Sequence, residues 1–306
     1  MRGLAALLWA FGMPAATHYV TLAGLGGEAD YEQRFAGWAR EAEKILAAAG
    51  GEVKTYTLYG SEARAARIRE LFAHLARQAQ AHDALVLLLI GHGTFDGFEY
   101  KFNLPGPDLT AEELAVLLDR VPAARQLVVN ATSASGASLE WLRKPGRVVI
   151  TATKSGMEKN ATVFARYWIE ALRDPAADTD KNEVISALEA FRYADQKTAK
   201  FYESQKRLAT EHPLLEDTGS GPGVRAPSPE QGSGRLAAAF PLVRFGRAQA
   251  AAADPARRAL LARKEELEQR IDLLKYRKAA MEAGEYRKQL AALLIELARL
   301  QQELDQ

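Results

Sequence analysis

Short apolar stretches typical of strands alternate with amphipathic stretches typical of helices from about residue 18 to about residue 215. The strand-like stretches are residues 18–23, 53–59, 84–90, 126–130 and 147–153, and the helix-like ones are residues 31–49, 61–81, 111–120 and 161–172. Two of the strands, 84–90 and 147–153, are continuously apolar, as expected for parallel strands covered on both faces. The alternation predicts a three-layer α/β/α sandwich around a mostly parallel sheet.

The last third of the chain divides into a segment rich in turn-forming residues and a segment with heptad repeats. Residues 216–234 concentrate Gly, Pro and Ser, so we predict that 216–253 is a linker and connecting segment. Residues 254–306 carry two heptad series, which are Leu260, Leu267, Leu274 and Met281, and then Leu290, Leu297 and Leu304. The series lose phase near Gly284, which predicts an antiparallel helical hairpin or one coiled-coil helix with a stutter, the hairpin being favoured. Such a tail either packs against its own domain or mediates self-association.

The first residues, 1–16, have the order of a secretory signal peptide. Arg2 is followed by an apolar run over residues 4–13 and then by Pro14, Ala15 and Ala16. This pattern predicts export to the periplasm or the outside, and the alternative is a buried first strand or helix. The apolar run is shorter than the roughly 20 residues that a membrane span needs, and no later stretch is longer, so we expect no integral span in the mature chain.

Composition and charge exclude several classes of protein. With 48% hydrophobic and 26% charged residues, the chain has the composition of a folded globular protein. Its 40 Lys and Arg nearly balance 39 Asp and Glu, so no overall field attracts nucleic acid. The chain has no cysteine, which excludes disulfides, thiolate metal sites and a thiol nucleophile.

Candidate catalytic residues follow two of the expected strands. Gly91-His92-Gly93 comes directly after residues 84–90, and a run of small and hydroxyl residues from Asn130 to Gly136 comes after residues 126–129. Because the carboxyl ends of neighbouring parallel strands open into one crevice, we expect these two strands to be adjacent in the sheet. His92 is then the candidate base, Ser133 the nucleophile with Ser135 as the alternative, and the amide of Gly93 the oxyanion donor. No third partner that orients the imidazole is identifiable, and a lone histidine is more often structural than catalytic.

Three blocks of this sequence, LLLIGHG, LVVNATSASG and RVVITATKSG, resemble the core of the caspase-type and legumain-type peptidases. In that family a histidine ends one strand and a cysteine follows the next strand in an Ala-Cys-x-Ser-Gly-like turn. Aligning Ser135-Gly136 with the family's Ser-Gly places Ser133 at the cysteine position and His92 at the position of the base. The resemblance covers about residues 18–215 and implies a caspase-like α/β/α domain.

The replacement of the cysteine leaves three functions open. A serine hydroxyl needs much more activation than a thiol, so a site shaped for cysteine need not work with serine. The resemblance therefore implies a pseudopeptidase that binds a peptide or protein ligand without cleaving it. The alternatives are a hydrolase that uses Ser133 and His92, and an unrelated use of the fold.

Residues 178–189 match most of the twelve-residue calcium loop of EF-hands. The expected ligands are the side chains of Asp178, Asp180, Asn182 and Glu189 and the carbonyl of Val184. Glu183 occupies the sixth position, where the motif has a glycine, and this substitution requires φ > 0 from a residue that resists it. The pattern predicts either a weak calcium site or an acidic loop that caps a helix, and no other cofactor is required.

Other polar residues near the expected strands have less specific patterns. Glu158 and Asn160 follow residues 147–153, where they either line the crevice or cap a helix. Glu211 and His212 lack the spacing to a second histidine, so we predict no zinc site.

Overall fold

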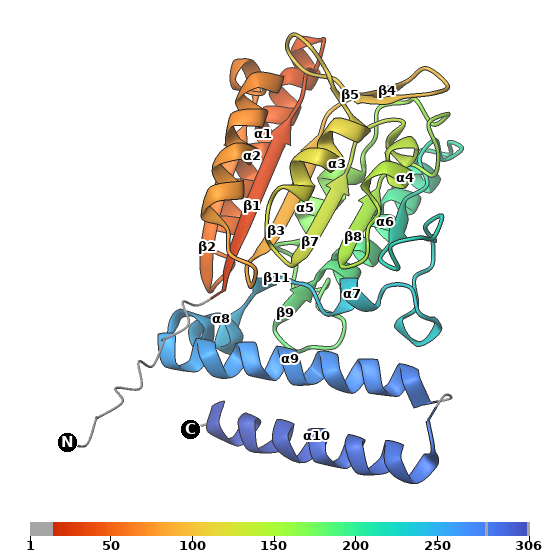
Figure 1. Cartoon of the computed structure of the whole chain (residues 1–306). Helices are drawn as coiled ribbons and strands as arrows, with labels where there is room; N and C mark the ends of the chain where they lie inside the picture. Colours follow the sequence, from red (N-terminus) through yellow and green to blue (C-terminus); the bar gives the residue numbers. More distant parts are fainter. Residues whose placement is uncertain (1–14, 279–280, 305–306) are drawn as a thin grey trace, which may run out of the picture.

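The computed structural model describes residues 15–278 and 281–304, and a six-stranded sheet forms its centre (Figure 1). The strands lie in the order β10-β8-β7-β3-β1-β2. Their bounds are β1 Ala16–Ala23, β2 Glu52–Leu58, β3 Ala84–Ile90, β7 Arg125–Asn130, β8 Arg147–Thr151 and β10 Leu214–Glu216. All neighbours pair in parallel except β10, which runs antiparallel to β8. The predicted mostly parallel sheet is confirmed, as is the pairing of β3 with β7.

Helices cover both faces of this sheet. Alternate side chains of β1 and β3 point to opposite faces: Tyr19 and Val86 pack with α1, α5 and α6, whereas Val20 and Leu87 pack with α2 and α3. The helix bounds are α1 Ala29–Ala47, α2 Ala65–Gln78, α3 Ala111–Asp119, α4 Leu139–Leu142, α5 Phe164–Ala171 and α6 Ala187–Ser204. Every residue of β3 is buried, which explains why its sequence is apolar without alternation. The structure is therefore the predicted three-layer α/β/α sandwich.

A small second sheet follows β3 at the carboxyl edge of the large one. It consists of β4 Gly93–Phe95, β5 Tyr100–Phe102 and β6 Leu109–Thr110, paired antiparallel in that order. Its strands are two or three residues long, too short to produce a recognisable hydrophobic period. Short 3₁₀ turns occur at Gly60–Glu62, Ser135–Ser138 and Pro229–Gln231.

The opposite, amino edge of the sheet is held by a buried hydrogen bond between a histidine and an aspartate. His18 of β1 lies with its Nε2 atom 3.2 Å from Oδ2 of Asp83, and the other carboxylate oxygen accepts the amide of Ala16 at 2.8 Å. Burial lowers the pKa of His18, although the hydrogen bond to Asp83 opposes that effect. This pair fixes the start of β1 beside the start of β3 and lies far from the candidate catalytic residues.

Residues 216–253 differ from the expected linker because most of them belong to the domain. Asp217 accepts amides of Gly234 and Ala237 at 2.7 and 3.2 Å and so holds α7 (Arg235–Ala238). β11 (Pro241–Arg244) then pairs antiparallel with β9 (Val184–Ser186). Phe240, Leu242 and Val243 are buried in the core. Carboxylate–amide bonds between distant residues order this segment, and such bonds leave no trace in local composition.

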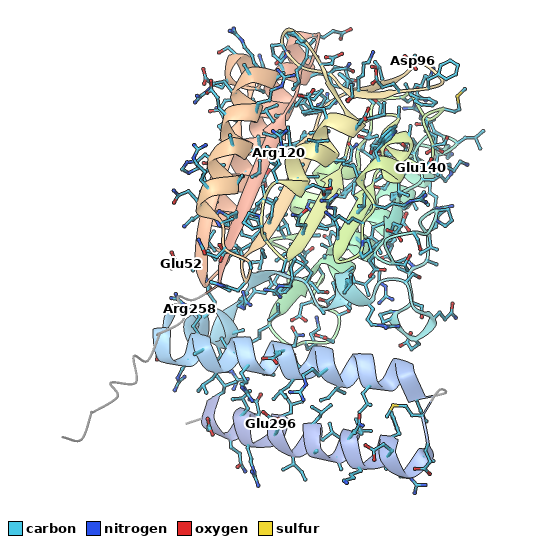
Figure 2. The ribbon with its side chains drawn as sticks, in the orientation of Figure 1. Glu52, Asp96, Arg120, Glu140, Arg258 and Glu296 are labelled. Carbon is cyan, nitrogen blue, oxygen red and sulfur yellow. The ribbon has the colours of Figure 1, made fainter. Side chains whose placement is uncertain are left out.

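The C-terminal residues form the predicted helical hairpin. After α8 (Gly246–Ala253), the helices α9 (Pro255–Arg277) and α10 (Ala283–Leu304) run side by side beneath the sheet (Figure 1). Their apolar residues pack together in one cluster, which includes Leu267, Ile271, Leu274, Leu293 and Leu300. Arg258 near the start of α9 lies 3.5 Å from Glu52 at the start of β2 (Figure 2).

Two expectations concern membranes and export. Among the described residues, no helix combines the length and the apolar character that a membrane span requires. The predicted leader, residues 1–16, lies outside the described residues up to position 14 and stays an expectation.

Candidate functional site

Four chain segments meet at the carboxyl edge of the sheet. His92 and Gly93 follow β3, residues 131–136 follow β7, and residues 152–163 follow β8. Because β10 is antiparallel to β8, with Leu214 opposite Thr151, the residues just before β10 also lie at this edge. The edge therefore brings together both sequence-predicted motifs and adds two segments that the motifs did not include.

His92 is half-buried against helix α1 (Ala29–Ala47). Its ring packs edge-on against Tyr31 and Phe35, at centroid distances of 4.8 and 5.2 Å. Burial lowers the pKa of His92, while a hydrogen bond to the backbone of Gly26 and nearby acidic side chains oppose that shift. His92 is thus a neutral imidazole at neutral pH, held by aromatic rings on one side.

Ser133 is closed off by the backbone of Gly93. Its hydroxyl donates to the carbonyl oxygen of Gly93 at 3.1 Å and accepts the Gly93 amide, also at 3.1 Å. The serine is only 2% exposed. The amide of Gly93, expected to serve an oxyanion, therefore points to the Ser133 hydroxyl. A Cβ at Gly93 would lie 2.5 Å from the Ser133 carbonyl oxygen, so this close approach requires glycine.

Ser135 is fully buried and connects the loop after β7 to the end of β8. Its hydroxyl lies 3.2 Å from Oγ1 of Thr153 and accepts the Thr153 amide at 3.1 Å. The same Thr153 hydroxyl accepts the amide of Gly136 at 2.9 Å. Both candidate serines therefore bridge neighbouring segments of the edge.

A hydroxyl network that the sequence did not predict lies beneath this loop. The hydroxyl of Tyr100 lies 2.7 Å from Oγ1 of Thr132, which donates to Oδ1 of Asn130 at 2.8 Å. The side-chain nitrogen Nδ2 of Asn130 donates to the hydroxyl of Ser138 at 2.9 Å and so extends the hydrogen-bond network. Burial raises the pKa of Tyr100 to about 12, so its phenol keeps its proton. The only sequence signal for this network was the density of small polar residues after β7. Tyr100 could not be assigned to it, because this residue belongs to the small sheet that the sequence did not predict.

A histidine–carboxylate pair also lies at this edge. Nδ1 of His212 bonds to Oε1 of Glu158, whose Oε2 accepts the amides of His212 and Lys154 at 3.1 and 2.9 Å. The Glu158 carbonyl accepts the amide of Ala134 at 2.8 Å, directly beside Ser133. No local pattern linked His212 to Glu158, because only the antiparallel pairing of β10 brings them together.

Glu211, next to this pair, is a buried acid. Its carboxylate accepts the amides of Val163 and Phe164 at the start of α5, at 2.8 and 3.2 Å, and the hydroxyl of Tyr202 at 2.9 Å. Burial raises the pKa of Glu211 to about 7 despite these donors, and the charge of Glu158 adds to the rise. The carboxyl group anchors the amino end of α5 to the segment before β10.

His92 and Ser133 share an edge but do not form a catalytic pair in this arrangement. No hydrogen bond links them within residues 15–278 and 281–304, and both hydrogen-bonding roles of the Ser133 hydroxyl are taken by Gly93. Nucleophilic catalysis needs an accessible hydroxyl bonded to its base. The observed arrangement can position a ligand at the edge, whereas acyl transfer would require the loop after β7 to rearrange.

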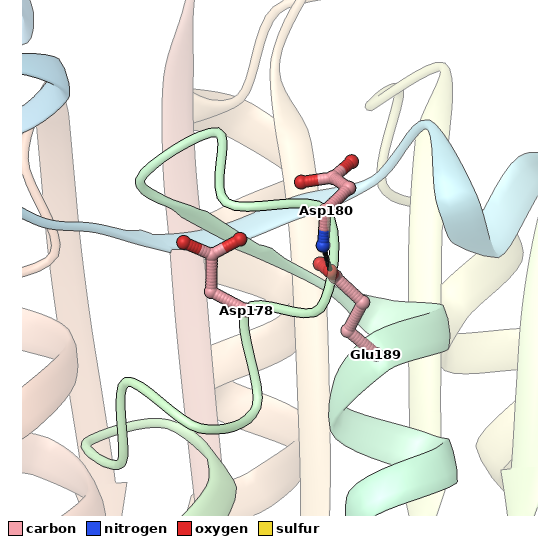
Figure 3. Close-up of side chains that lie close together, drawn as sticks. All are labelled: Asp178, Asp180 and Glu189. Carbon is pink, nitrogen blue, oxygen red and sulfur yellow. Dashed lines mark hydrogen bonds between the residues drawn. The ribbon is translucent and has the colours of Figure 1, made fainter.

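The calcium-loop residues converge in part, as Figure 3 shows. Carboxylate oxygens of Asp178, Asp180 and Glu189 lie within 4.8 Å of one another. Asn182 is exposed, and its Oδ1 accepts the amide of Val184, the first residue of β9, at 2.8 Å. Burial raises the pKa of Asp180, and the charge of Glu189 adds to the rise. Oxygen donors of this kind suit a hard cation, which would relieve their mutual repulsion.

Glu183 makes the sharp turn that the loop requires. Its φ is +64°, the left-handed region that the motif normally reserves for glycine. Its carboxylate accepts the amide of Ala248 at 3.0 Å and thereby caps α8. The same loop also forms a capping box at the start of α6, in which Ser186 and Glu189 bond reciprocally. Both expected uses of the loop are thus compatible with its geometry.

A crevice of about 260 Å³ lies at the amino edge, away from these residues. Arg147 lines it, but its guanidinium already donates to Gln126, Leu142 and Asp119 at 2.6–2.9 Å. The crevice therefore offers no unpaired cation from Arg147 to a ligand.

The fold and this edge define a class of protein: an α/β/α sandwich with polar side chains gathered where its parallel strands end, the usual place for ligands in such sheets. No protein-family model matches the chain, and no curated protein matches it.

Solved structures with a similar arrangement include two caspases. The initiator caspase Dronc of Drosophila is 9% identical, with 69% of this chain and 82% of that chain covered and a TM-score of 0.45. Caspase-1 of Spodoptera frugiperda is 12% identical over 67% of this chain and 87% of that chain, with a TM-score of 0.45. A Geobacter sulfurreducens protein is 11% identical over 76% of this chain and 100% of that chain, with a TM-score of 0.48.

Proposed function

We propose that this chain is a caspase-like or legumain-like pseudopeptidase, which binds a peptide or protein at the carboxyl edge of its sheet without cleaving it. One observation carries the proposal: the hydroxyl of Ser133, which the resemblance aligns with the family's cysteine, is 2% exposed and bonded to the backbone nitrogen and oxygen of Gly93. Attack on a substrate would break both bonds, and leaving such buried polar groups unpaired costs about 1–3 kcal/mol each.

Exposed apolar side chains near the edge support a peptide or protein ligand. Phe98, at the tip of the β4–β5 hairpin, is 92% exposed, and Met157, in the loop after β8, is 73% exposed. The two loops lie together, because a Cβ at Gly156 would meet the ring of Phe95 of β4 at 2.2 Å. Apolar groups of this kind within a polar surface are typical of interaction sites.

The alternative function is hydrolysis by Ser133 with His92 as the base. It is favoured by the single edge that both residues share. A fluorophosphonate probe distinguishes the two functions, because it labels activated serines. We expect that the probe does not label the wild-type chain. Labelling of Ser133 in the wild type that both Ser133→Ala and His92→Ala abolish would establish the hydrolase instead.

Restoring a thiol tests whether the edge is a degenerate protease site. In Ser133→Cys the thiolate needs less activation than the hydroxyl, so cleavage of a peptide library would indicate a lost nucleophile in an intact cleft. Continued inactivity is expected, since His92 packs against α1. Ser138→Cys, which also places a thiol in the buried hydroxyl network, is the matched control.

Ligand binding has its own test. A random-peptide library selected on the wild-type chain should yield ligands whose capture falls at least about tenfold in Phe98→Ala and in Met157→Ala, since buried apolar anchors dominate such interfaces. Leu208→Ala is the control, because Leu208 is 91% exposed and lies outside the two loops. Ligands that bind all three variants equally would contradict binding at this edge.

We also propose that the loop of residues 178–189 binds calcium weakly. Three converging carboxylates and the positive φ of Glu183 support this proposal. Affinity should lie around 10⁻⁴–10⁻³ M, the range of extracellular sites, and export would place the loop at such calcium levels. Millimolar calcium should raise the midpoint of thermal unfolding in the wild type and not in Glu189→Gln, which keeps a capping-box residue. Glu203→Gln on the same helix is the control, and an equal rise in Glu189→Gln would contradict the site.

A further inference from the structure

Most of the heptad side chains of α10 are packed inside the hairpin. Tyr286, Leu290, Leu293, Leu297 and Leu300 all pack in the cluster shared with α9. Arg263 of α9 forms an ion pair at 2.6 Å with Glu296 of α10 along one side of this cluster. Figure 2 labels Glu296. Within the described part of the chain, α9 is the one element that packs extensively against α10. The heptad series therefore does not provide a free surface for a partner.

A different face of α10 remains uncovered. Leu294 is 47% exposed and Ile295 is 55% exposed, and the exposed residues Ala291 and Ala298 lie one turn before and after them. These four residues, spaced i, i+3, i+4 and i+7, form one continuous stripe, which we call the outer stripe. Helix α10 is the layer farthest from the sheet, with α9 in between, so the outer stripe is open to solvent (Figure 1).

The outer stripe is complementary to itself. Its order, Ala291, Leu294, Ile295, Ala298, is nearly palindromic about the point between Leu294 and Ile295. In an antiparallel pair of α10 helices, each small Ala291 meets a small Ala298, and each Leu294 meets an Ile295. A two-fold interface requires this kind of self-complementary patch, because the same surface is used on both copies.

Charge at the two ends of the stripe favours the antiparallel orientation. Arg287 and Lys288, both exposed, flank its amino end, whereas its carboxyl end carries the exposed Arg299 and Glu303, whose opposite charges offset each other, and the neutral Gln302. Antiparallel pairing places the basic end of one copy beside the neutral end of the other, whereas parallel pairing brings four cations together. The dipoles of two antiparallel helices attract each other, which adds a smaller stabilisation of the antiparallel orientation.

We propose that the outer stripe of α10 joins two copies of this chain, antiparallel, so that the two hairpins form a four-helix bundle. This surface is independent of the carboxyl edge and of any ligand bound there. The two copies would place their sheets on opposite sides of the bundle, with both carboxyl edges facing away from it.

The molar mass of the full chain tests the proposal. Light scattering after gel filtration should give twice the mass of one chain, falling to one chain on dilution. Leu294→Glu should weaken the dimer about tenfold or more, since an unpaired carboxylate would be buried. Gln289→Glu adds the same charge to an exposed position off the stripe and should leave the dimer intact. Helical circular dichroism checks that both variants fold.

Three results would overturn it. A wild-type chain that stays monomeric, or a dimer that Leu294→Glu leaves unchanged, removes the outer stripe as the interface. Recovery of the monomer on vesicles of mixed neutral and anionic lipid would assign the stripe to a membrane surface instead.

Crosslinking tests the orientation without any large change of side chain. The chain has no cysteine, so each introduced thiol is the only one. A mixture of Ala291→Cys and Ala298→Cys chains should form a disulfide-linked pair, and Ala291→Cys alone should not, because only opposed positions bring Cβ atoms within about 4.5 Å. Self-crosslinking of Ala291→Cys would show parallel pairing, and the absence of any crosslink in the mixture would refute the antiparallel dimer.

Discussion

At the carboxyl edge of the sheet, the pKa values of two side chains differ from those of the same groups in solution. Burial lowers the pKa of His92 and raises that of Glu211 to about 7, so each favours its uncharged form. The serines beside them are bonded to backbone atoms rather than to a base. Residue chemistry at this edge therefore stabilises the loops, and it makes the stability of the protein depend on pH.

Glu211→Gln should flatten that pH dependence. The folded-state pKa of Glu211, about 7, lies above the ordinary 4.5, so the folded protein binds the proton more tightly than the unfolded chain. The resulting contribution to the free energy of unfolding is complete below pH 4.5 and is lost as the pH rises through 7. The loss amounts to about 3 kcal/mol, from about 1.4 kcal/mol per unit of pKa. Urea unfolding at pH 5 and pH 8 should differ less in Glu211→Gln than in the wild type.

Glu203→Gln is the control for this measurement, because Glu203 is exposed on the same side of the sheet. It should reproduce the wild-type dependence. An equally steep loss of stability in Glu211→Gln would assign the pH dependence to another buried acid whose pKa burial raises, such as Asp217.

Among the elements, the loop of residues 178–189 shows how one segment supports several others. Its Glu183 caps α8, its Glu189 caps α6, and its strand β9 pairs with β11. These bonds explain why a glutamate is kept in a backbone conformation that favours glycine. The loop thus connects α6 and α5 of the domain to β11 and α8.

Two substitutions at Glu183 separate its backbone from its side chain. Glu183→Ala keeps the strained φ of +64° and loses the cap on α8, whereas Glu183→Gly loses the cap and relieves the strain. The glycine variant should therefore unfold about 2–4 °C higher than the alanine variant. Thermal unfolding without calcium gives the comparison, and an alanine variant as stable as the glycine variant would mean that the backbone is unstrained.

At the scale of the whole molecule, the boundary between domain and tail lies after α8. The core includes Phe240, Leu242 and Val243, whereas α9 and α10 form a separate apolar cluster. The ion pair between Arg258 and Glu52 links the tail to the sheet at the surface, where such pairs contribute little.

Two truncations test this boundary. A chain ending at Ala253 should unfold cooperatively, since it keeps the complete sandwich. A chain ending at Glu216 removes the three large buried apolar side chains Phe240, Leu242 and Val243, worth roughly 2 kcal/mol each or about 6 kcal/mol in total, against a typical stability of about 5–15 kcal/mol. We expect this shorter chain to lose its cooperative urea transition. A cooperative transition would instead show that residues 217–253 are a linker that the folded core does not need.

The sequence by itself determined the elements whose signal is local. A wholly apolar strand at residues 84–90 indicated a doubly covered parallel sheet. The positions of His92, Ser133 and Ser135 just after strands predicted that they share one edge of that sheet, whereas the preference for Ser133 as nucleophile rested on the family resemblance. Heptad spacing and its loss of phase near Gly284 predicted the two helical stripes and favoured the hairpin over a single helix with a stutter. The positive φ of Glu183 followed from the loop motif.

The tertiary structure alone decided what those residues contact. Ser133 is bonded to Gly93, 40 residues away, and Glu158 to His212, 54 residues away. The small sheet, the order in residues 216–253 and the exposed face of α10 likewise depend on partners distant in the chain. Hydrophobic periodicity is set by which face of an element is buried, whereas a hydrogen bond between loops is set by the packing of the elements that carry them, and that packing is non-local.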